Sequence, residues 1–245
     1  VLFFTSKDSE TRISNQTFYG DTIPSNNNIF FQTIYTEIVN CKFMSITDSN
    51  DEQSLLFGGL CICTTRSTKI DSCYFFAIFS RRTGSAILFI EEYEYIDSTV
   101  VNCVFKSITQ RPDDTETSFY SGGAVSHGQL LFNDGFSPLY IRSSLTANCC
   151  FDKIRLHGSI YDYNGIQAGV VTYVSYLIKS KNLNFTNNEM QGNILQFGCI
   201  TIYCDSYSEN SFSFINIFNC LYNHIGSFSL IFLTEEKQEF SLSFA

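Results

Sequence analysis

The sequence predicts an all-β chain that folds as a β-solenoid of about seven coils, joined by loops of variable length. Three observations predict this fold class. A short motif recurs along the 245 residues, its apolar positions are two residues apart, and no helical pattern separates one copy from the next. A motif that recurs every roughly 20 to 50 residues is typical of repeat architectures, in which each unit buries its apolar face against its neighbours.

The repeated motif is Asn-Cys-x-Phe-x-x-Ile, and some copies carry another residue at one of these positions. Leucine replaces cysteine in the copy that begins at Asn182, which indicates that this position requires an apolar side chain. The aromatic anchors are 25 residues apart at their closest, from Phe18 to Phe43, and 46 at most, from Phe105 to Phe151. In chain order, the copies are Asn40–Ile46, Ser72–Ile78, Asn102–Ile108, Asn148–Ile154 and Asn219–Ile225, with weaker ones at Asn15–Phe18 and Asn182–Phe185.

The cysteine and the aromatic residue of each copy are two residues apart, which is the side-chain period of a strand and places both on one face. Segments such as 29–35 and 170–174 are rich in β-branched and aromatic residues, as strands are. Stacked copies would form two inward-facing ladders. The predicted core ladders are Cys41, Cys73, Cys103, Cys149 and Cys220, and Phe43, Phe75, Phe105, Phe151, Phe185 and Tyr222. A β-sandwich is the alternative, but it predicts hairpin turns every ~8 to 12 residues and no equivalence among core cysteines.

Composition and charge argue against several classes of function. The net charge is −9, whereas a nucleic-acid surface needs clustered lysine and arginine, so we expect no nucleic-acid partner. The longest purely apolar runs are far shorter than the ~18 to 20 residues of a membrane-spanning helix, so we expect no membrane-spanning segment in this chain.

A second motif, small residues followed by an apolar run, lies between the anchors. Its copy Gly-Gly-Ala-Val at Gly122–Val125, together with Phe-x-x-Asn at Phe185–Asn188, resembles the polymorphic outer-membrane-protein repeat. That repeat typifies chlamydial autotransporters and related surface proteins of some protists. The resemblance covers most of the chain and implies a right-handed parallel β-helix, with adhesion at the cell surface or in the extracellular space as the usual assignment. We expect residues 1–245 to form a single β-helix domain and to be a segment of a longer chain.

The ten cysteines are an even number, as a disulfide framework would require. In a parallel ladder, however, neighbouring side chains run side by side and do not point toward one another. We therefore expect the ladder cysteines to be mostly reduced core residues. Cys150 alternates outward and is the best candidate for a reactive or paired thiol.

Two Asn-x-Thr triplets, at Asn15 and Asn184, are possible N-glycosylation sites if a eukaryote exports the protein. Asn184 lies between the inward-facing Leu183 and Phe185, so strand alternation places it on the outer face. The repeated asparagine that precedes each cysteine is expected to be a turn residue, or one member of an outer ladder of stacked amides.

The sequence contains no recognisable catalytic set. Right-handed β-helix enzymes that cleave polysaccharides need clustered carboxylates, or calcium with an arginine base, but the acidic residues here fall mostly in predicted loops. The triplet Ser126-His127-Gly128 departs from the Gly-His-Gly of polygalacturonases. We therefore predict no enzyme, no catalytic residue, no cofactor and no metal, and keep a polysaccharide-degrading enzyme as an alternative.

We expect a non-enzymatic protein that binds a protein or carbohydrate at a surface through its loops and side walls. The longest insertion lies between the anchors Phe105 and Phe151. Its predicted partner-contacting residues are Arg111, Asp113, Asp114 and Glu116. The alternative from another class is a structural scaffold or filament element that stacks end to end with copies or further coils of itself, because neither end of the sequence has the polar pattern of a capping repeat.

Overall fold

The structure is a computed structural model in which nearly all described residues belong to β-strands. It describes residues 2–20, 29–47, 61–63, 66–80, 86–89, 97–110, 123–131, 137–139, 141–157, 167–191, 196–204, 209–222 and 228–232. No α-helix occurs among these residues, and their strands form one 19-stranded sheet and one separate two-stranded sheet. The all-β prediction is confirmed.

The large sheet consists of three sets of parallel strands, here called the first, second and third walls. The first wall contains β1 (Leu2–Ser14), β3 (Ile29–Val39), β6 (Ser67–Asp71), β9 (Asp97–Val101), β14 (Ile141–Asp152), β16 (Gln167–Thr186) and β19 (Glu209–Phe218). The second wall contains β2 (Thr17–Tyr19), β4 (Lys42–Thr47), β7 (Tyr74–Ser80), β10 (Val104–Gln110), the carboxyl ends of β14, β16 and β19, and then β15 (Arg155–His157), β17 (Glu189–Gln191) and β20 (Leu221–Tyr222).

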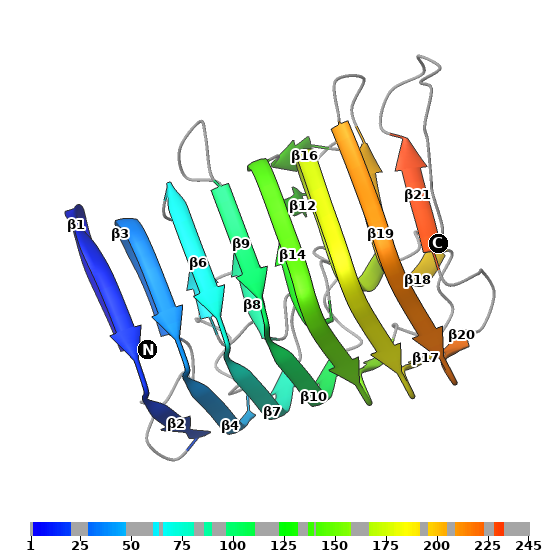
Figure 1. Ribbon diagram of the computed structural model, residues 1–245, viewed down its shortest axis with the longest axis horizontal. Coiled ribbons are helices and arrows are strands. Elements are labelled where there is room, and N and C mark those ends of the chain that lie inside the picture. Colours follow the sequence, from blue (N-terminus) through cyan, green and yellow to red (C-terminus); the bar gives the residue numbers. More distant parts are fainter. Residues whose placement is uncertain are drawn as a thin grey trace.

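The third wall contains β5 (Cys61–Cys63), β8 (Ile87–Phe89), β11 (Val125–His127), β18 (Gln196–Cys204) and β21 (Phe228–Phe232), together with the amino-terminal parts of β1, β3 and β16. The separate sheet is the antiparallel pair β12 (Gln129–Leu131) and β13 (Ser137–Leu139). In Figure 1 the strands of the first wall lie side by side from β1 to β19, and β2, β4, β7 and β10 continue below them at a different tilt. This open stack of parallel strands is compatible with a β-solenoid.

The repeated asparagine marks the corner between the first and second walls. Backbone φ is positive there, as at Asn40 (φ 53), Asn102 (φ 56) and Asn148 (φ 54). This left-handed conformation costs most L-residues about 1 to 2 kcal/mol, and asparagine tolerates it best among residues with a side chain. The equivalent corner positions are Asn15, Asn40, Ser72, Asn102, Asn148, Asn182 and Phe214.

A second left-handed position follows six of these corners, all but Asn15, after five residues and bends the second wall. Its occupants vary more, since Ala77 (φ 54) and Lys153 (φ 57) adopt it as well as asparagine. The positions are Ser45, Ala77, Ser107, Lys153, Asn187 and Asn219. The fixed interval between the two corners explains why the motif is constant while the loops outside it vary.

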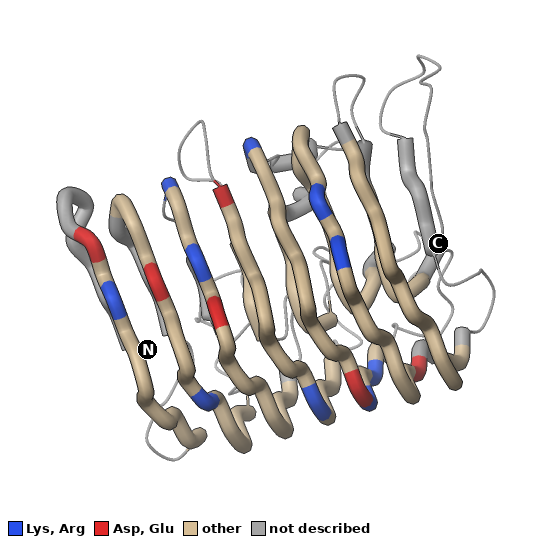
Figure 2. The backbone as a smooth tube through the Cα atoms, viewed as in Figure 1, with Lys and Arg blue, Asp and Glu red and all other residues tan. Residues whose placement is uncertain are grey.

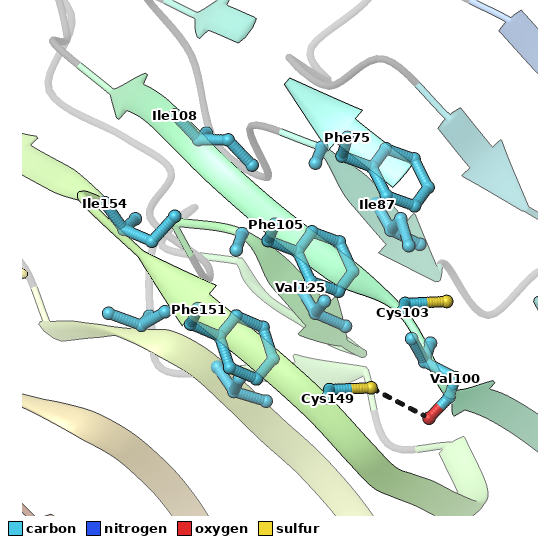
Figure 3. Packing of buried hydrophobic residues seen from close by; sticks show 14 of the residues in the cluster. Phe75, Ile87, Val100, Cys103, Phe105, Ile108, Val125, Cys149, Phe151 and Ile154 are labelled. Carbon is cyan, nitrogen blue, oxygen red and sulfur yellow. Dashed lines mark hydrogen bonds between the residues drawn. The ribbon is translucent and has the colours of Figure 1, made fainter. Parts of the chain in front are cut away.

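Phenylalanine side chains stack along the inside of the second wall. Phe43, Phe75, Phe105 and Phe151 are fully buried, and the ring centroids of successive residues are 4.8 to 4.9 Å apart. The stack extends to Phe185 at one end, and Figure 3 shows its centre with aliphatic side chains of the third wall facing the rings. Each buried ring contributes roughly 1.5 to 3 kcal/mol of transfer free energy, so this stack is a main source of stability.

The register corrects the last predicted copy of the motif. Leu183 pairs with Ile215, not with Cys220, and Phe185 pairs with Ile217, not with Tyr222. Tyr222 instead pairs with Met190, and Cys220 follows the second left-handed position. Because asparagine is favoured at both left-handed positions, Asn219-Cys220 imitates the first corner although it lies at the second.

Candidate functional site

The ladder cysteines belong to the core and not to a reactive site. Cys41, Cys73, Cys103 and Cys149 are buried and form no disulfide, and each thiol faces backbone carbonyl groups. The thiol of Cys103, for example, donates to the carbonyl of Val101 at 3.1 Å. Hydrogen bonds with the Cys149 and Cys73 thiols, together with burial, raise the pKa of Cys103 well above its usual range. The Cys103 thiol, held protonated in this way, is a poor nucleophile, and burial keeps all four thiols away from solvent.

Cys150 is half-buried and free on the outer side of β14. Burial, and after it the nearby carboxylate of Asp152, raise the pKa of this thiol. The environment therefore opposes thiolate formation, which argues against the reactive role proposed from the sequence. The side chains of Cys61, Cys63 and Cys204 lie outside the described residues.

The two glycosylation triplets occupy different surroundings. Asn15 is exposed at a corner, with φ 56, and its backbone N–H donates to the carbonyl of Val39. Asn184 is half-buried on the outer side of β16, and its side-chain oxygen accepts a hydrogen bond of 2.8 Å from Asn216. The outward orientation expected for Asn184 agrees with this contact.

Three further expectations concern the partner loop, a membrane-spanning segment and a metal site. Arg111, Asp113, Asp114 and Glu116 of the predicted partner loop lie outside the described residues. Of the residues that the structure describes, none forms a helix long and apolar enough to cross a membrane. Within the same ranges, no group of three or more His, Cys, Asp or Glu side chains is arranged to hold a metal ion.

His127 is a core residue. Its imidazole is fully buried between the rings of Phe89 and Tyr173, with both centroids 5.0 Å away. Its Nδ1 lies 2.7 Å from the hydroxyl of Ser98, and its Nε2 lies 2.8 Å from that of Thr146. Burial lowers the pKa of His127 to about 3, so the ring is neutral. Because both ring nitrogens are engaged inside the protein, this histidine cannot reach a ligand in solution.

A ladder of amides runs along the corner between the first and second walls. Asn182 donates to Asn148 (2.9 Å), Asn148 donates to Asn102 (3.0 Å), and Asn102 donates to the carboxylate of Asp71 (2.8 Å). Partial burial opposes ionisation of Asp71, but hydrogen bonds from Asn102 and Lys69, among others, lower its pKa overall. Each amide forms a hydrogen bond with its neighbour in the stack, so we interpret this ladder as structural.

The outer face of the first wall carries paired charges at one end. Glu37 lies 3.7 Å from both Arg12 and Lys69, and Lys69 lies 3.0 Å from Asp71. Figure 2 shows these alternating red and blue segments on β1, β3 and β6. Exposed ion pairs of this kind are worth only about 0 to 1 kcal/mol, and their charges are already matched. The described charges on β1, β3 and β6 therefore offer no unbalanced site.

The second wall has a different outer face, because strand alternation brings large apolar side chains outward. Phe75 faces the core, so Tyr74 and Phe76 on either side of it face out, and their rings stack with centroids 5.9 Å apart. Around them lie Tyr19, which is 45% exposed, Val104, which is 36% exposed, and the half-buried Met44. These five side chains form what we call the aromatic patch.

The register makes the aromatic patch contiguous. Tyr19 pairs with Met44 and Met44 with Phe76 across one row, and Tyr74 pairs with Val104 across the next. Strands are ~4.8 Å apart and residues two apart on a strand are ~6.6 Å apart, so the side chains of the two rows are neighbours. Four strands that are distant in sequence, β2, β4, β7 and β10, thus contribute to one surface.

Two lysines border the central ring pair on opposite sides. Lys42 of β4 pairs with Tyr74, and Lys106 of β10 pairs with Phe76. Lys42 is exposed, whereas Lys106 is half-buried and lies close enough to Asp152 to help lower the pKa of that carboxyl group. In a chain with a net charge of −9, two lysines beside an aromatic platform are a local reversal of charge.

The aromatic patch can bind a ligand by stacking on its rings and by ion pairing at its edges. Exposed contiguous apolar surface commonly marks an interaction site. From the sequence, Phe75 and Phe43 were assigned to the core, but no role was predicted for the outward-facing residues on either side of them. The alternation of inward and outward positions in Tyr74-Phe75-Phe76 predicts that Tyr74 and Phe76 face outward, but it does not show which residues of other strands lie beside them.

Comparisons with known proteins found no match: no family model, no curated protein and no solved structure is similar to this chain.

Proposed function

We propose that the protein is a right-handed parallel β-helix of about seven coils that acts in adhesion or ligand binding at a cell surface or in the extracellular space, without catalysing a reaction. Seven equivalent corner positions in register support the coil number. Parallel strands of one sheet are joined by right-handed crossovers in about 98% of cases, which supports the handedness. The resemblance to the polymorphic outer-membrane-protein repeat agrees with the handedness.

The observation that carries the functional proposal is the aromatic patch. Five large apolar side chains on the outer face of the second wall are half-buried or exposed. Aromatic residues are enriched where proteins contact partners. The second wall presents them on a rigid sheet, so a ligand meets a preformed surface and little ordering opposes binding.

Adhesion of protein-coated beads tests this proposal. Beads carrying the full chain are applied to a panel of cultured cells and immobilised extracellular matrix, and so are beads carrying the double variant Tyr74→Thr, Phe76→Thr. Threonine keeps the strand propensity of the site while removing both rings. We expect wild-type beads to adhere to at least one surface and the double variant to lose most of that adhesion.

The matched control is Tyr176→Thr, because Tyr176 is 41% exposed and belongs to the first-wall strand β16. The control should adhere like the wild type. Equal adhesion of the double variant, or no adhesion of the wild type to any surface, would contradict the proposal. Antibody staining of intact and permeabilised cells of the source tests the location separately, and we expect intact cells to be stained.

A second function, end-to-end stacking as a scaffold, is favoured by a different observation. Ile215 and Ile217 occupy the ladder positions of Leu183 and Phe185 but are only partly buried, and Phe218 and Leu221 beside them are 68% and 66% exposed. Further coils or a second copy at this end would cover Ile215 and Ile217, whereas Phe218 and Leu221 are in register with the outward Thr186 and Glu189. Sedimentation velocity at increasing concentration tests this function, since growing oligomers are expected for a scaffold and a constant monomer excludes it.

A further inference from the structure

We propose that the ligand of the aromatic patch is a carboxylate-bearing glycan, whose sugar rings stack on Tyr74 and Phe76 and whose carboxylates pair with Lys42 and Lys106. This inference rests on the proposed function and names the chemical class of its ligand. The argument has three steps, which concern the size of the patch, its shape and its charge.

The size of the patch favours a linear ligand over a folded protein. A standard protein interface contributes about 20 to 30 residues and ~800 Å² from each partner. The aromatic patch has five side chains, and several of them are half-buried. A glycan needs only a few contact residues for each sugar, so the patch suits one or two sugar units of a chain that continues along the wall.

The shape of the patch favours sugar rings. Tyr74 and Phe76 stack, with an angle of 10° between their ring planes and centroids 5.9 Å apart. The two half-buried rings form one aromatic pair on the outer face of the second wall. One face of a pyranose ring carries only C–H groups, and such a face packs against the π-system of an aromatic side chain. The hydroxyl groups at the rim of the sugar remain in water.

The charge around the patch favours a carboxylate-bearing chain. Lys42 and Lys106 lie on opposite corners of the ring pair, two strands apart along the wall. Lys42 is exposed and belongs to no ion pair that the described residues form. Lys106 also interacts with Asp152, so Lys42 is expected to contribute more to binding. A neutral glycan would leave both ammonium groups without a function in recognition.

Isothermal titration of the full chain tests the inference. The probes are hexagalacturonate and a hyaluronan hexamer, both of which carry carboxylates, and the methyl ester of hexagalacturonate, which has the same rings without the charge. We expect at least one acidic probe to bind and its affinity to fall as salt is raised, because salt screens exposed charges. The methyl ester should bind at least roughly threefold more weakly than the acid.

Variants assign the binding to the patch. Tyr74→Thr should lower the affinity roughly three- to tenfold, in keeping with the worth of one aromatic contact. Lys42→Gln should lower it roughly two- to fivefold, as expected for an exposed ion pair. The matched control is Lys179→Gln, because Lys179 is an exposed lysine on the outer side of the first wall. It should bind like the wild type, and thermal melting confirms that each variant is folded.

Three results would overturn the inference: no acidic probe binds, the methyl ester binds as tightly as the acid, or Tyr74→Thr and Lys42→Gln bind like the wild type. The bead assay separates this failure from that of the proposed function. If adhesion still requires Tyr74 and Phe76 while no acidic glycan binds, the surface function stands with a ligand of another class. If adhesion does not require the two rings, the proposed function itself fails.

Discussion

His127 should make the stability of the protein depend on pH in a range where most carboxylates do not titrate. The imidazole is fully buried against Phe89 and Tyr173, and its two nitrogens contact the hydroxyls of Ser98 and Thr146. Burial lowers its pKa from 6.5 to about 3 in the folded state. In the unfolded chain the ring recovers its ordinary pKa, so between these values only the unfolded state binds the proton.

The sign and size of the effect follow from this difference. The contribution of His127 is fully present above pH 6.5 and is lost as pH falls, until it levels off near the folded pKa of about 3. One pKa unit corresponds to ~1.4 kcal/mol, so the free energy of unfolding should fall by about 2 kcal/mol between pH 7 and pH 5 from this residue alone. Asp71 contributes little in that interval, because hydrogen bonds lower its pKa below 3.8.

Urea denaturation at pH 7, 6 and 5 measures this dependence in the wild type and in His127→Gln. Glutamine removes the titrating group. The variant should therefore lose about 2 kcal/mol less free energy of unfolding than the wild type between pH 7 and pH 5, although it is less stable than the wild type at pH 7. The control His157→Gln removes a half-buried histidine and should keep most of the wild-type dependence. A wild-type and a His127→Gln curve that run parallel from pH 7 to pH 5 would refute the reasoning.

Three substitutions test the repeat itself, with stability measured by urea denaturation. Asn148→Ala should lower the free energy of unfolding by about 2 to 3 kcal/mol, because alanine is strained at φ 54 and the amide ladder loses two hydrogen bonds. Asn148→Gly loses the same hydrogen bonds without the strain, so it should lower the free energy of unfolding by only about 1 kcal/mol. Equal losses would contradict the assigned backbone. Ala77→Gly should stabilise the protein by about 0.5 to 1 kcal/mol, since glycine adopts φ 54 freely, and a loss would count against it. Phe105→Ala should cost about 3 to 5 kcal/mol, and a loss below 1 kcal/mol would mean that the ring is not stacked in the core.

The spacing of the motif was sufficient to predict the strands and most of the core. Cysteine and phenylalanine two residues apart indicate one face of a strand, and the structure buries Cys103 and Phe105 together in this way. The asparagine before each cysteine was expected to be a turn residue or part of an amide ladder, and Asn102 and Asn148 are both. These features were predictable because they depend on local backbone preference and on side-chain period.

The register of the last repeat could not be predicted from the motif. Phe214 occupies the left-handed corner that asparagine occupies elsewhere, so the sequence carries no visible signal at that position. Asn219-Cys220, which lies at the second corner, matches the motif instead. The pairing of Leu183 with Ile215 reveals the shift, because register depends on contacts between strands that are far apart in sequence.

The candidate site was beyond sequence reasoning for a related cause. Tyr19, Met44, Tyr74 and Val104 belong to four strands, and nothing in their local sequences shows that they are neighbours. The apolar positions of the motif are inward residues, which repeat from copy to copy. The outward residues differ from one copy to the next. A surface composed of non-repeating positions becomes visible only when the coils are placed in register.

Hydroxyl-radical footprinting of the aromatic side chains, with and without an acidic hexasaccharide, tests the central claim most directly. In the free protein, Tyr74 and Phe76 should be oxidised while Phe75 between them is not, because alternate residues of β7 face solvent and core. Saturating glycan should protect Tyr74 and Phe76 and leave Tyr176, on the first-wall strand β16, as reactive as before. Oxidation of Phe75 at the rate of its neighbours would contradict the stacked wall, and equal reactivity of Tyr74 with and without glycan would contradict its role as a binding surface.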